Sequence, residues 1–216
     1  MNSDLFDFPG RSLRRHESIG PASVILRGYV LPDGAAILRQ IASIAVQAPF
    51  RRMTTPGGFT MSVAMTSCGA CGWITDRLGY RYSRTDPVSG RHWPAMPDLF
   101  NQVGVNAARD AGFAGFSPDS CLINRYQPGA KMSLHQDRDE RDLSQPIVSV
   151  SLGLDAVFLF GGMTRGDKSQ RIILRHGDVV VWGGEDRLRF HGVLPLKAGT
   201  HPAAGGYRYN LTFRRS

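Results

Sequence analysis

Short runs in which apolar and polar residues alternate occupy the second half of the chain, from about residue 118 onward. Alternation with a period of two is typical of a strand that buries one face. Glycine and proline separate these runs, as turns between antiparallel strands require. The succession predicts a β-sandwich or barrel. Its predicted strands are Ser120–Gln127, Ile147–Leu154, Ala156–Phe160, Arg171–Arg175, Asp178–Gly184 and Tyr207–Arg215.

The first half of the chain carries a helical pattern. Apolar residues recur at helical spacing from about Asp33 to Gln47 and again from Pro97 to Ala111, which predicts two amphipathic helices. A strand is predicted just before the first helix, over Ser23–Val30. Residues 1–22 are polar and aperiodic, so we expect a flexible N-terminal tail there.

The segment between the two predicted helices, about residues 49–96, is rich in glycine, arginine, methionine and aromatic residues. Short alternating pieces at Phe59–Thr66 and Gly79–Ser83 predict hairpins and loops. A chain of 216 residues that is 42% hydrophobic can bury one sizeable core. We therefore expect a single α+β domain over residues 23–216, whose antiparallel β core spans about 118–216.

Composition bears on the compartment. No stretch of about 18 apolar residues occurs, and the first twenty residues lack the apolar segment of a secretory signal. The three cysteines are too few for a disulfide framework. Cys68 and Cys71 form a CxxC pair, but no second pair at zinc-finger spacing follows, which favours reduced thiols. These features predict a soluble cytoplasmic protein with no membrane partner.

The charge balance adds a candidate partner. Lysine and arginine exceed aspartate and glutamate by 26 to 18, which gives a net charge of +8. A basic surface suits nucleic acid. Of the basic residues 23 are arginine, which favours phosphate and carboxylate recognition but is also what a genomic codon bias would produce. Charge alone therefore supports both interpretations equally.

The sharpest chemical signal is the sequence His135-Gln136-Asp137. Residues two apart in an extended segment share a face, so the imidazole and the carboxylate can converge on one ion. We expect His191 as third ligand, because it ends an alternating run and Gly192 lets the backbone approach a neighbour. Two histidines and one carboxylate are the ligand set of non-haem Fe(II) oxygenases. The alternative interpretation is that these histidines and the aspartate are ordinary polar residues on the surface.

The last predicted strand gives a second signal. Alternation places Arg208, Asn210, Thr212 and Arg214 on one face, while the intervening apolar residues face a core. The α-carbons of the two arginines lie about 20 Å apart along such a strand. If both guanidiniums reach inward, the gap between them suits a small dicarboxylate. An edge strand with a solvated polar face is the alternative.

These segments resemble the AlkB family of iron(II)- and 2-oxoglutarate-dependent dioxygenases. The resemblance extends from about Ser23 to Arg214 and is carried by CLINRYQPGAKMSLHQDRD, DVVVWGG, His191 and RYNLTFR. The HxD...H triad is common to the wider superfamily, whereas NRYxPG and RxNxxxR are more restrictive. The resemblance implies a double-stranded β-helix, or jelly roll, with N-terminal helices and a hairpin lid that recognises a nucleotide.

The resemblance also implies roles for individual residues. Fe(II) would be held by His135, Asp137 and His191. Alternation points one member of the implied cosubstrate set, Arg125, away from the others. The set implied to bind 2-oxoglutarate is Asn124, Arg125, Tyr126, Arg208, Asn210 and Arg214, with residues 208 and 214 at its opposite carboxylates.

Residues 49–96 correspond in this resemblance to the nucleotide-recognition lid. Trp73 would stack on a flipped base together with His135, and Asp139 would attract a cationic methylated base. Hydrophobic packing inside a small lid is the alternative for the aromatic residues. The implied substrate contacts are Trp73, Tyr80, Arg81, Tyr82, Asp139 and Arg165.

The implied reaction uses Fe(II), 2-oxoglutarate and O2 to remove methyl groups oxidatively from 1-methyladenine and 3-methylcytosine. The expected substrate is alkylated single-stranded DNA, with RNA as an alternative, and the products are formaldehyde, succinate and CO2. Such a reaction repairs alkylation damage directly. We expect the enzyme to be a monomer.

Three other functions fit part of the pattern. A related oxygenase would keep iron and 2-oxoglutarate but hydroxylate a protein side chain or a metabolite. A non-catalytic nucleic-acid-binding module would retain the metal pocket as a vestige. A zinc hydrolase would use the two histidines and the carboxylate but leave the paired arginines unexplained.

Overall fold

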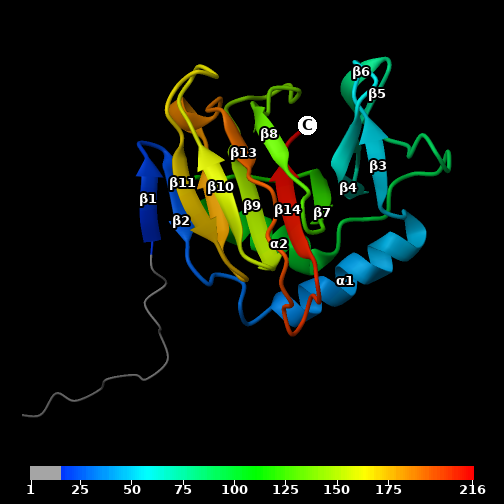
Figure 1. Cartoon of the computed structure of the whole chain (residues 1–216), viewed down its shortest axis with the longest axis horizontal. Coiled ribbons are helices and arrows are strands. Elements are labelled where there is room, and N and C mark those ends of the chain that lie inside the picture. The colour runs from blue at the N-terminus through cyan, green and yellow to red at the C-terminus, as the bar shows by residue number, and fades with distance from the viewer. Residues whose placement is uncertain (1–15) are drawn as a thin grey trace, which may run out of the picture.

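Two antiparallel sheets pack face to face in the computed structural model, which describes residues 16–216 (Figure 1). This arrangement is the jelly roll predicted from the sequence. The larger sheet contains, in spatial order, β1 (His16–Gly20), β2 (Ser23–Leu26), β12 (Val179–Trp182), β9 (Ile147–Gly153), β14 (Arg208–Arg214), β7 (Ser120–Tyr126), β4 (Thr60–Gly69) and β3 (Arg51–Thr54).

The smaller sheet forms the other layer of the sandwich, and a separate hairpin lies next to β3 and β4 of the larger sheet. In order, the smaller sheet contains β11 (Gln170–Leu174), β10 (Ala156–Phe160), β13 (His191–Val193) and β8 (Met132–His135). The hairpin consists of β5 (Gly72–Asp76) and β6 (Gly79–Ser83), which form a two-stranded sheet of their own. Figure 1 shows this hairpin near β3 and β4, on the opposite side of the molecule from β1 and β2.

Two helices cover the outer face of the larger sheet. They are α1 (Gly34–Gln47) and α2 (Asp98–Asp110), and a 3₁₀ turn, η1 (Gly184–Asp186), follows β12. Ile37 and Ile41 of α1 and Phe100 of α2 are almost fully buried against the sheet. No helix among residues 16–216 is both long and apolar enough to cross a membrane.

The larger sheet separates two cores with different roles. One core lies beneath the helices, and the other lies between the sheets, where Phe158, Phe160 and Trp182 pack. Strand β14 shows how alternation divides them. Leu211 and Phe213 pack in the helix-side core, while the alternate residues Asn210, Thr212 and Arg214 line the space between the sheets.

Both helices and the core strands lie close to their predicted positions, but two expectations at the N-terminus were wrong. The strand predicted over Ser23–Val30 ends at Leu26, where a turn begins. Residues 16–20 form β1, which pairs with β2 at the edge of the larger sheet, although we expected a flexible tail over 1–22. Its sequence, HESIG, lacks an apolar alternation because an edge strand buries little side-chain surface. The remainder of the predicted tail, residues 1–15, lies outside the described residues.

The helix-side core should stabilise the fold without contributing to the site. Phe100 is 1% exposed and meets Phe213 edge to face at 6.3 Å. We expect Phe100→Ala to lower the free energy of unfolding by about 3–5 kcal/mol, because it leaves a cavity. Urea denaturation measures this loss. Val46→Ala is the control, because Val46 is 83% exposed, and a loss of similar size there would contradict the assignment.

Candidate active site

Strand pairing brings the two predicted histidine ligands together. His135 ends β8 and His191 begins β13, and the two residues are direct partners in the antiparallel register. Their ring centroids lie 4.4 Å apart. A Cβ atom at Gly192 would lie 2.7 Å from the carbonyl oxygen of Met132, so glycine is required for this close approach. The pairing therefore depends on the residue next to the ligand.

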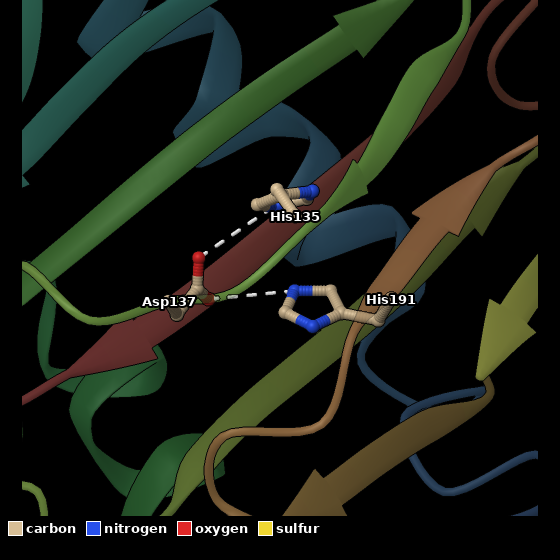
Figure 2. A group of neighbouring side chains, drawn as sticks. All are labelled: His135, Asp137 and His191. Carbon is tan, nitrogen blue, oxygen red and sulfur yellow. Dashed lines mark ion pairs between the residues drawn. The ribbon is translucent and has the colours of Figure 1, made fainter. Parts of the chain in front are cut away.

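Asp137 completes a compact group of three ligand atoms. It follows β8, and its Oδ1 and Oδ2 lie 3.6 Å from His135 Nε2 and 3.7 Å from His191 Nε2, respectively (Figure 2). The three ligand atoms all lie within 4.8 Å of one another. Two imidazoles and one carboxylate at this spacing fit a divalent transition metal.

Backbone carbonyls orient both imidazoles. His135 Nδ1 lies 2.9 Å from the Ser133 oxygen, and His191 Nδ1 lies 3.0 Å from the Arg189 oxygen. A carbonyl can only accept, so each Nδ1 must be the donor. The lone pair of each neutral ring is then on Nε2, which faces Asp137. The histidines are thus prepared to bind a metal.

Electrostatics keeps the ligands in the required protonation states. Burial opposes ionisation of Asp137, but Arg214 and His191 hold the pKa of its carboxyl well below the usual value. Arg214 Nη2 donates to Asp137 Oδ2 at 2.7 Å. Burial and the neighbouring His191 lower the pKa of His135 to about 4. At neutral pH, Asp137 is therefore ionised and His135 is neutral.

A cavity of about 790 Å³ opens beside these ligands, between the two sheets. The alternate residues of β14 form part of its wall, as the sequence predicts. Asn210 donates to Ser149 Oγ at 2.8 Å and accepts from Asn124 at 3.3 Å, which fixes both amides. The buried polar residues of this wall are Asn124, Ser149, Arg208, Asn210, Thr212 and Arg214.

Arg208 is the strongest indication of an anionic ligand. Its side chain is buried, and its guanidinium lies over the ring of Tyr126 at 5.0 Å. Among residues 16–216, Nη2 donates to Ser151 Oγ at 2.9 Å, whereas the buried Nε and Nη1 have no hydrogen-bond partner. Burial lowers the pKa of Arg208, but a guanidinium stays protonated in proteins. A carboxylate in this cavity would satisfy both donors.

Arg125, a member of the predicted cosubstrate set, does not line this cavity. It lies on β7 between Asn124 and Tyr126, so the strand alternation points it to the opposite face. Its guanidinium lies 4.5 Å from the Phe50 ring centroid and 5.2 Å from that of Tyr207. Arg125 therefore packs against aromatic rings outside the cavity.

Four of the predicted substrate contacts lie around the cavity. Trp73 of β5 stacks on Tyr80 of β6 at 5.7 Å, and its Nε1 donates to Asp139 Oδ2 at 2.8 Å. Arg165 lies over the Phe190 ring at 5.1 Å and also lines the cavity. The rim of the cavity therefore combines aromatic rings with one negatively charged side chain, Asp139, and one positively charged side chain, Arg165.

The other two predicted contacts are engaged elsewhere. Both nitrogens at the end of Arg81 donate to the Asp76 carboxylate, at 2.8 and 2.7 Å, within the hairpin. The Tyr82 hydroxyl donates to Glu140 Oε1 at 2.5 Å. Neither residue lines the cavity. Strand alternation explains why Arg81 does not line the cavity, because it lies on the opposite face of β6 from Tyr80.

Sequence reasoning missed a buried ion-pair cluster behind the metal ligands. Arg187 and Glu140 pair at 3.0 Å, and Arg187 Nη1 also donates to the Asp137 carbonyl at 2.6 Å. These residues come from loops that are 47 positions apart, so no local pattern links them. The only available signal is that Glu140 closely follows the HxD motif.

Comparisons with known proteins agree with this geometry. The model of the 2OG-Fe(II) oxygenase superfamily matches residues 23–214. The chain is 59% identical to the "Alpha-ketoglutarate-dependent dioxygenase AlkB" of Salmonella typhimurium and 57% identical to that of Escherichia coli, over 93% of each chain. A solved structure, "The structure of OsALKBH1", is similar with a TM-score of 0.82 at 30% identity, covering 94% of this chain and 100% of the other.

The close approach at Gly192 generates a prediction about metal affinity. We expect Gly192→Ala to weaken Fe(II) binding on the order of 10–100-fold, because the added methyl group displaces His191 from His135. Anaerobic Fe(II) titration measures this. The control is Gly166→Ala, where nothing lies within 4 Å of the added carbon. Equal affinities of the two variants would contradict the register argument.

The unpaired donors of Arg208 generate a second prediction. We expect Arg208→Met to weaken 2-oxoglutarate binding on the order of 10²–10³-fold, since a buried charged partner is lost. The same change removes an uncompensated buried charge, so the ligand-free protein should gain about 1 kcal/mol of stability. Isothermal titration and urea denaturation measure the two effects. Arg125→Met should leave the affinity for 2-oxoglutarate unchanged. A larger loss of affinity in Arg125→Met than in Arg208→Met would contradict the placement of Arg208 in the cosubstrate pocket and of Arg125 outside it.

Proposed function

The chain belongs to the 2OG-Fe(II) oxygenase superfamily, and on that basis we propose that it is an iron(II)- and 2-oxoglutarate-dependent dioxygenase that demethylates bases in nucleic acid. The observation that carries this proposal is the His135, Asp137 and His191 group beside the unpaired donors of Arg208 in one cavity. High identity to the two AlkB enzymes over 93% of the chain supports the substrate class.

The metal site provides the oxidising chemistry. An Fe(II) ion held by these three residues would, with 2-oxoglutarate and O2, supply the oxidation of an N-methyl group, for which the products would be formaldehyde, succinate and CO2. His135 and His191 each present an Nε2 lone pair, and Asp137 presents a carboxylate oxygen. The bond from Arg214 fixes the rotation of that carboxylate. The protein thus positions the reactants and contributes no nucleophile.

The cosubstrate would lie along β14. Arg208 would hold one carboxylate with Nε and Nη1, the two donors that have no partner among the described residues, and Arg214 would hold the other. Asn124, Tyr126 and Asn210 line the cavity between the two arginines. Apolar side chains such as Leu122, Phe158 and Trp182 also line this cavity, and surroundings of low polarity strengthen charged hydrogen bonds.

The methylated base would enter over the metal ligands, between the hairpin and β8. Trp73 and His135 offer two faces for stacking, which contributes about 1–3 kcal/mol per base in nucleic-acid complexes. Asp139 supplies a negative charge for a cationic base, and Tyr80 and Arg165 lie at the rim to contact the backbone. Alkylated bases that cannot pair leave a helix at lower cost than intact bases.

The preferred substrate is alkylated single-stranded DNA carrying 1-methyladenine or 3-methylcytosine, which makes the reaction a direct repair of alkylation damage. The net charge of +8 supports binding to a polyanion. RNA is the alternative substrate. We place the enzyme in the cytoplasm, where its three free cysteines would stay reduced. A monomeric state stays a prediction.

Reconstitution under anaerobic conditions tests this function. We expect protein loaded with Fe(II) and 2-oxoglutarate, then given O2 and a 1-methyladenine oligonucleotide, to release formaldehyde and succinate in equal amounts. His135→Ala should abolish both products, while His201→Ala, a histidine outside the cavity, should retain them. Succinate without formaldehyde would indicate an oxygenase with a protein or metabolite substrate. Binding of the oligonucleotide with neither product would indicate a non-catalytic module.

A further inference from the structure

Arg125, which does not line the cavity, lies among aromatic rings on the outer face of the larger sheet. Its guanidinium carbon is 4.5 Å from the ring centroid of Phe50 and 5.2 Å from that of Tyr207. Tyr209, its direct partner in the β7–β14 register, is 6.1 Å from Phe50 and 6.2 Å from Tyr207 between ring centroids. The rings therefore hold the arginine in a fixed orientation on this face.

A second arginine shares this face of the sheet. Arg52 of β3 lies directly opposite Ala64 of β4, and Ala64 lies directly opposite Arg125 of β7. Directly opposite residues point to the same face, and the α-carbons of the two arginines are about 10 Å apart across two strand spacings. Only the small side chain of Ala64 lies between them in this row. We define the outer patch as Phe50, Arg52, Arg125, Tyr207 and Tyr209.

The outer patch carries positive charge. Among residues 16–216, no carboxylate forms an ion pair with Arg52 or Arg125. Helix α1 ends three residues before Phe50 and contains no acidic residue. Arg91 adds a further cation at this end of the helix, where it donates to the Gln47 carbonyl at 3.2 Å. A surface of this kind attracts a polyanion.

The residues of the outer patch are accessible to a ligand. Tyr207 is 39% exposed, Arg52 is exposed, and Phe50 and Arg125 are half-buried. Aromatic faces stack on bases of any sequence, and the planar fork of arginine binds phosphate through two parallel hydrogen bonds. Rings combined with cations are the chemistry by which proteins bind single nucleic-acid strands without reading their sequence.

Strand β4 connects the outer patch to the cavity. Thr60 begins β4 and lines the cavity, and Ala64 lies four residues farther, about 13 Å along the strand. That distance equals about four nucleotides at a rise of about 3.4 Å each. Figure 1 shows β3, β4 and the C-terminal end of α1 on the side of the molecule that carries the β5–β6 hairpin. A strand whose base enters the cavity can therefore reach the outer patch.

We propose that the outer patch is a second nucleic-acid-binding site, which holds the same single strand several nucleotides away from the base in the cavity. Arg52 and Arg125 bind phosphates, and Tyr207 stacks on a base. The proposal rests on the proposed function for the position of the reacting base. It deepens that function, because it makes a long strand a better ligand than a short one, whatever its sequence.

The dependence of affinity on strand length tests this site. The full chain is loaded with Fe(II) and 2-oxoglutarate without oxygen, so that binding is measured without turnover. Fluorescence anisotropy gives the affinity for single strands with a central 1-methyladenine. A strand of about five nucleotides stays at the cavity, whereas one of about fifteen reaches the outer patch. We expect wild-type protein to bind the long strand at least about tenfold more tightly, because two phosphate contacts are added.

Arg52→Gln and Arg125→Gln remove one phosphate contact each. We expect each change to weaken binding of the long strand about fivefold at about 0.1 M salt, and to reduce the slope of log affinity against log salt by about 0.7. Affinity for the short strand should change less than about twofold, because that strand ends before the patch. A merely structural role would not alter the salt slope. Arg52 is exposed, so its removal leaves the fold intact.

Arg171→Gln is the matched control. Arg171 is also an exposed arginine on a strand, and it lies on β11, an edge of the smaller sheet. Figure 1 shows β11 on the opposite side of the molecule from β3. This variant loses the same charge as the patch variants and should retain wild-type affinity and salt slope for both strands. It therefore separates a local contact from the effect of net charge.

Three results would overturn the proposal. The first is equal wild-type affinity for the two strand lengths, and the second is patch variants that behave like Arg171→Gln. The third is an equal loss for short and long strands in Arg52→Gln. The first two results would leave the outer patch to packing or to a protein partner. Failure of the proposed function appears separately, as absence of formaldehyde after oxygen is added, and leaves the length dependence measurable.

Discussion

Pairing between β8 and β13 is the interaction on which the site depends. It places His135 directly opposite His191, although 55 residues of chain separate them, and it brings Asp137 to the same point just past the end of β8. A shift of one residue in this register would turn one imidazole to the other face of the sheet. Gly192 makes the pairing close, and the carbonyls of Ser133 and Arg189 then set both tautomers.

Strand β14 provides the complementary constraint, because it carries two arginines into the buried space between the sheets. The strand lies between β9 and β7, so its inward residues cannot reach solvent at a sheet edge. Arg214 is neutralised by Asp137 and Glu140, whereas two donors of Arg208 lack partners in the part of the chain that the structure describes. Burying such a group costs stability in the ligand-free protein. This is the kind of cost that proteins carry at functional sites, where a ligand offsets it.

Much of this arrangement is predictable from the sequence. Periodicity gives both helices, the core strands and the inward face of β14, because each depends on local alternation of apolar and polar residues. The HxD spacing and the glycine after His191 indicate the ligands. Three features leave no periodic signal: the edge strand β1, the ion pair of Arg81 with Asp76 inside the hairpin, and the hydrogen bond from Tyr82 to Glu140. Only the last of them joins segments that are distant in the sequence.

A crystal structure of the protein with Fe(II) and 2-oxoglutarate, grown without oxygen and phased at the iron edge, tests the central claim most directly. The account predicts iron bound by Nε2 of His135, Nε2 of His191 and a carboxylate oxygen of Asp137. It also predicts a 2-oxoglutarate carboxylate at about 2.7–2.9 Å from the free donors of Arg208. Iron at another site, or a cosubstrate carboxylate that leaves those donors unpaired, would contradict it.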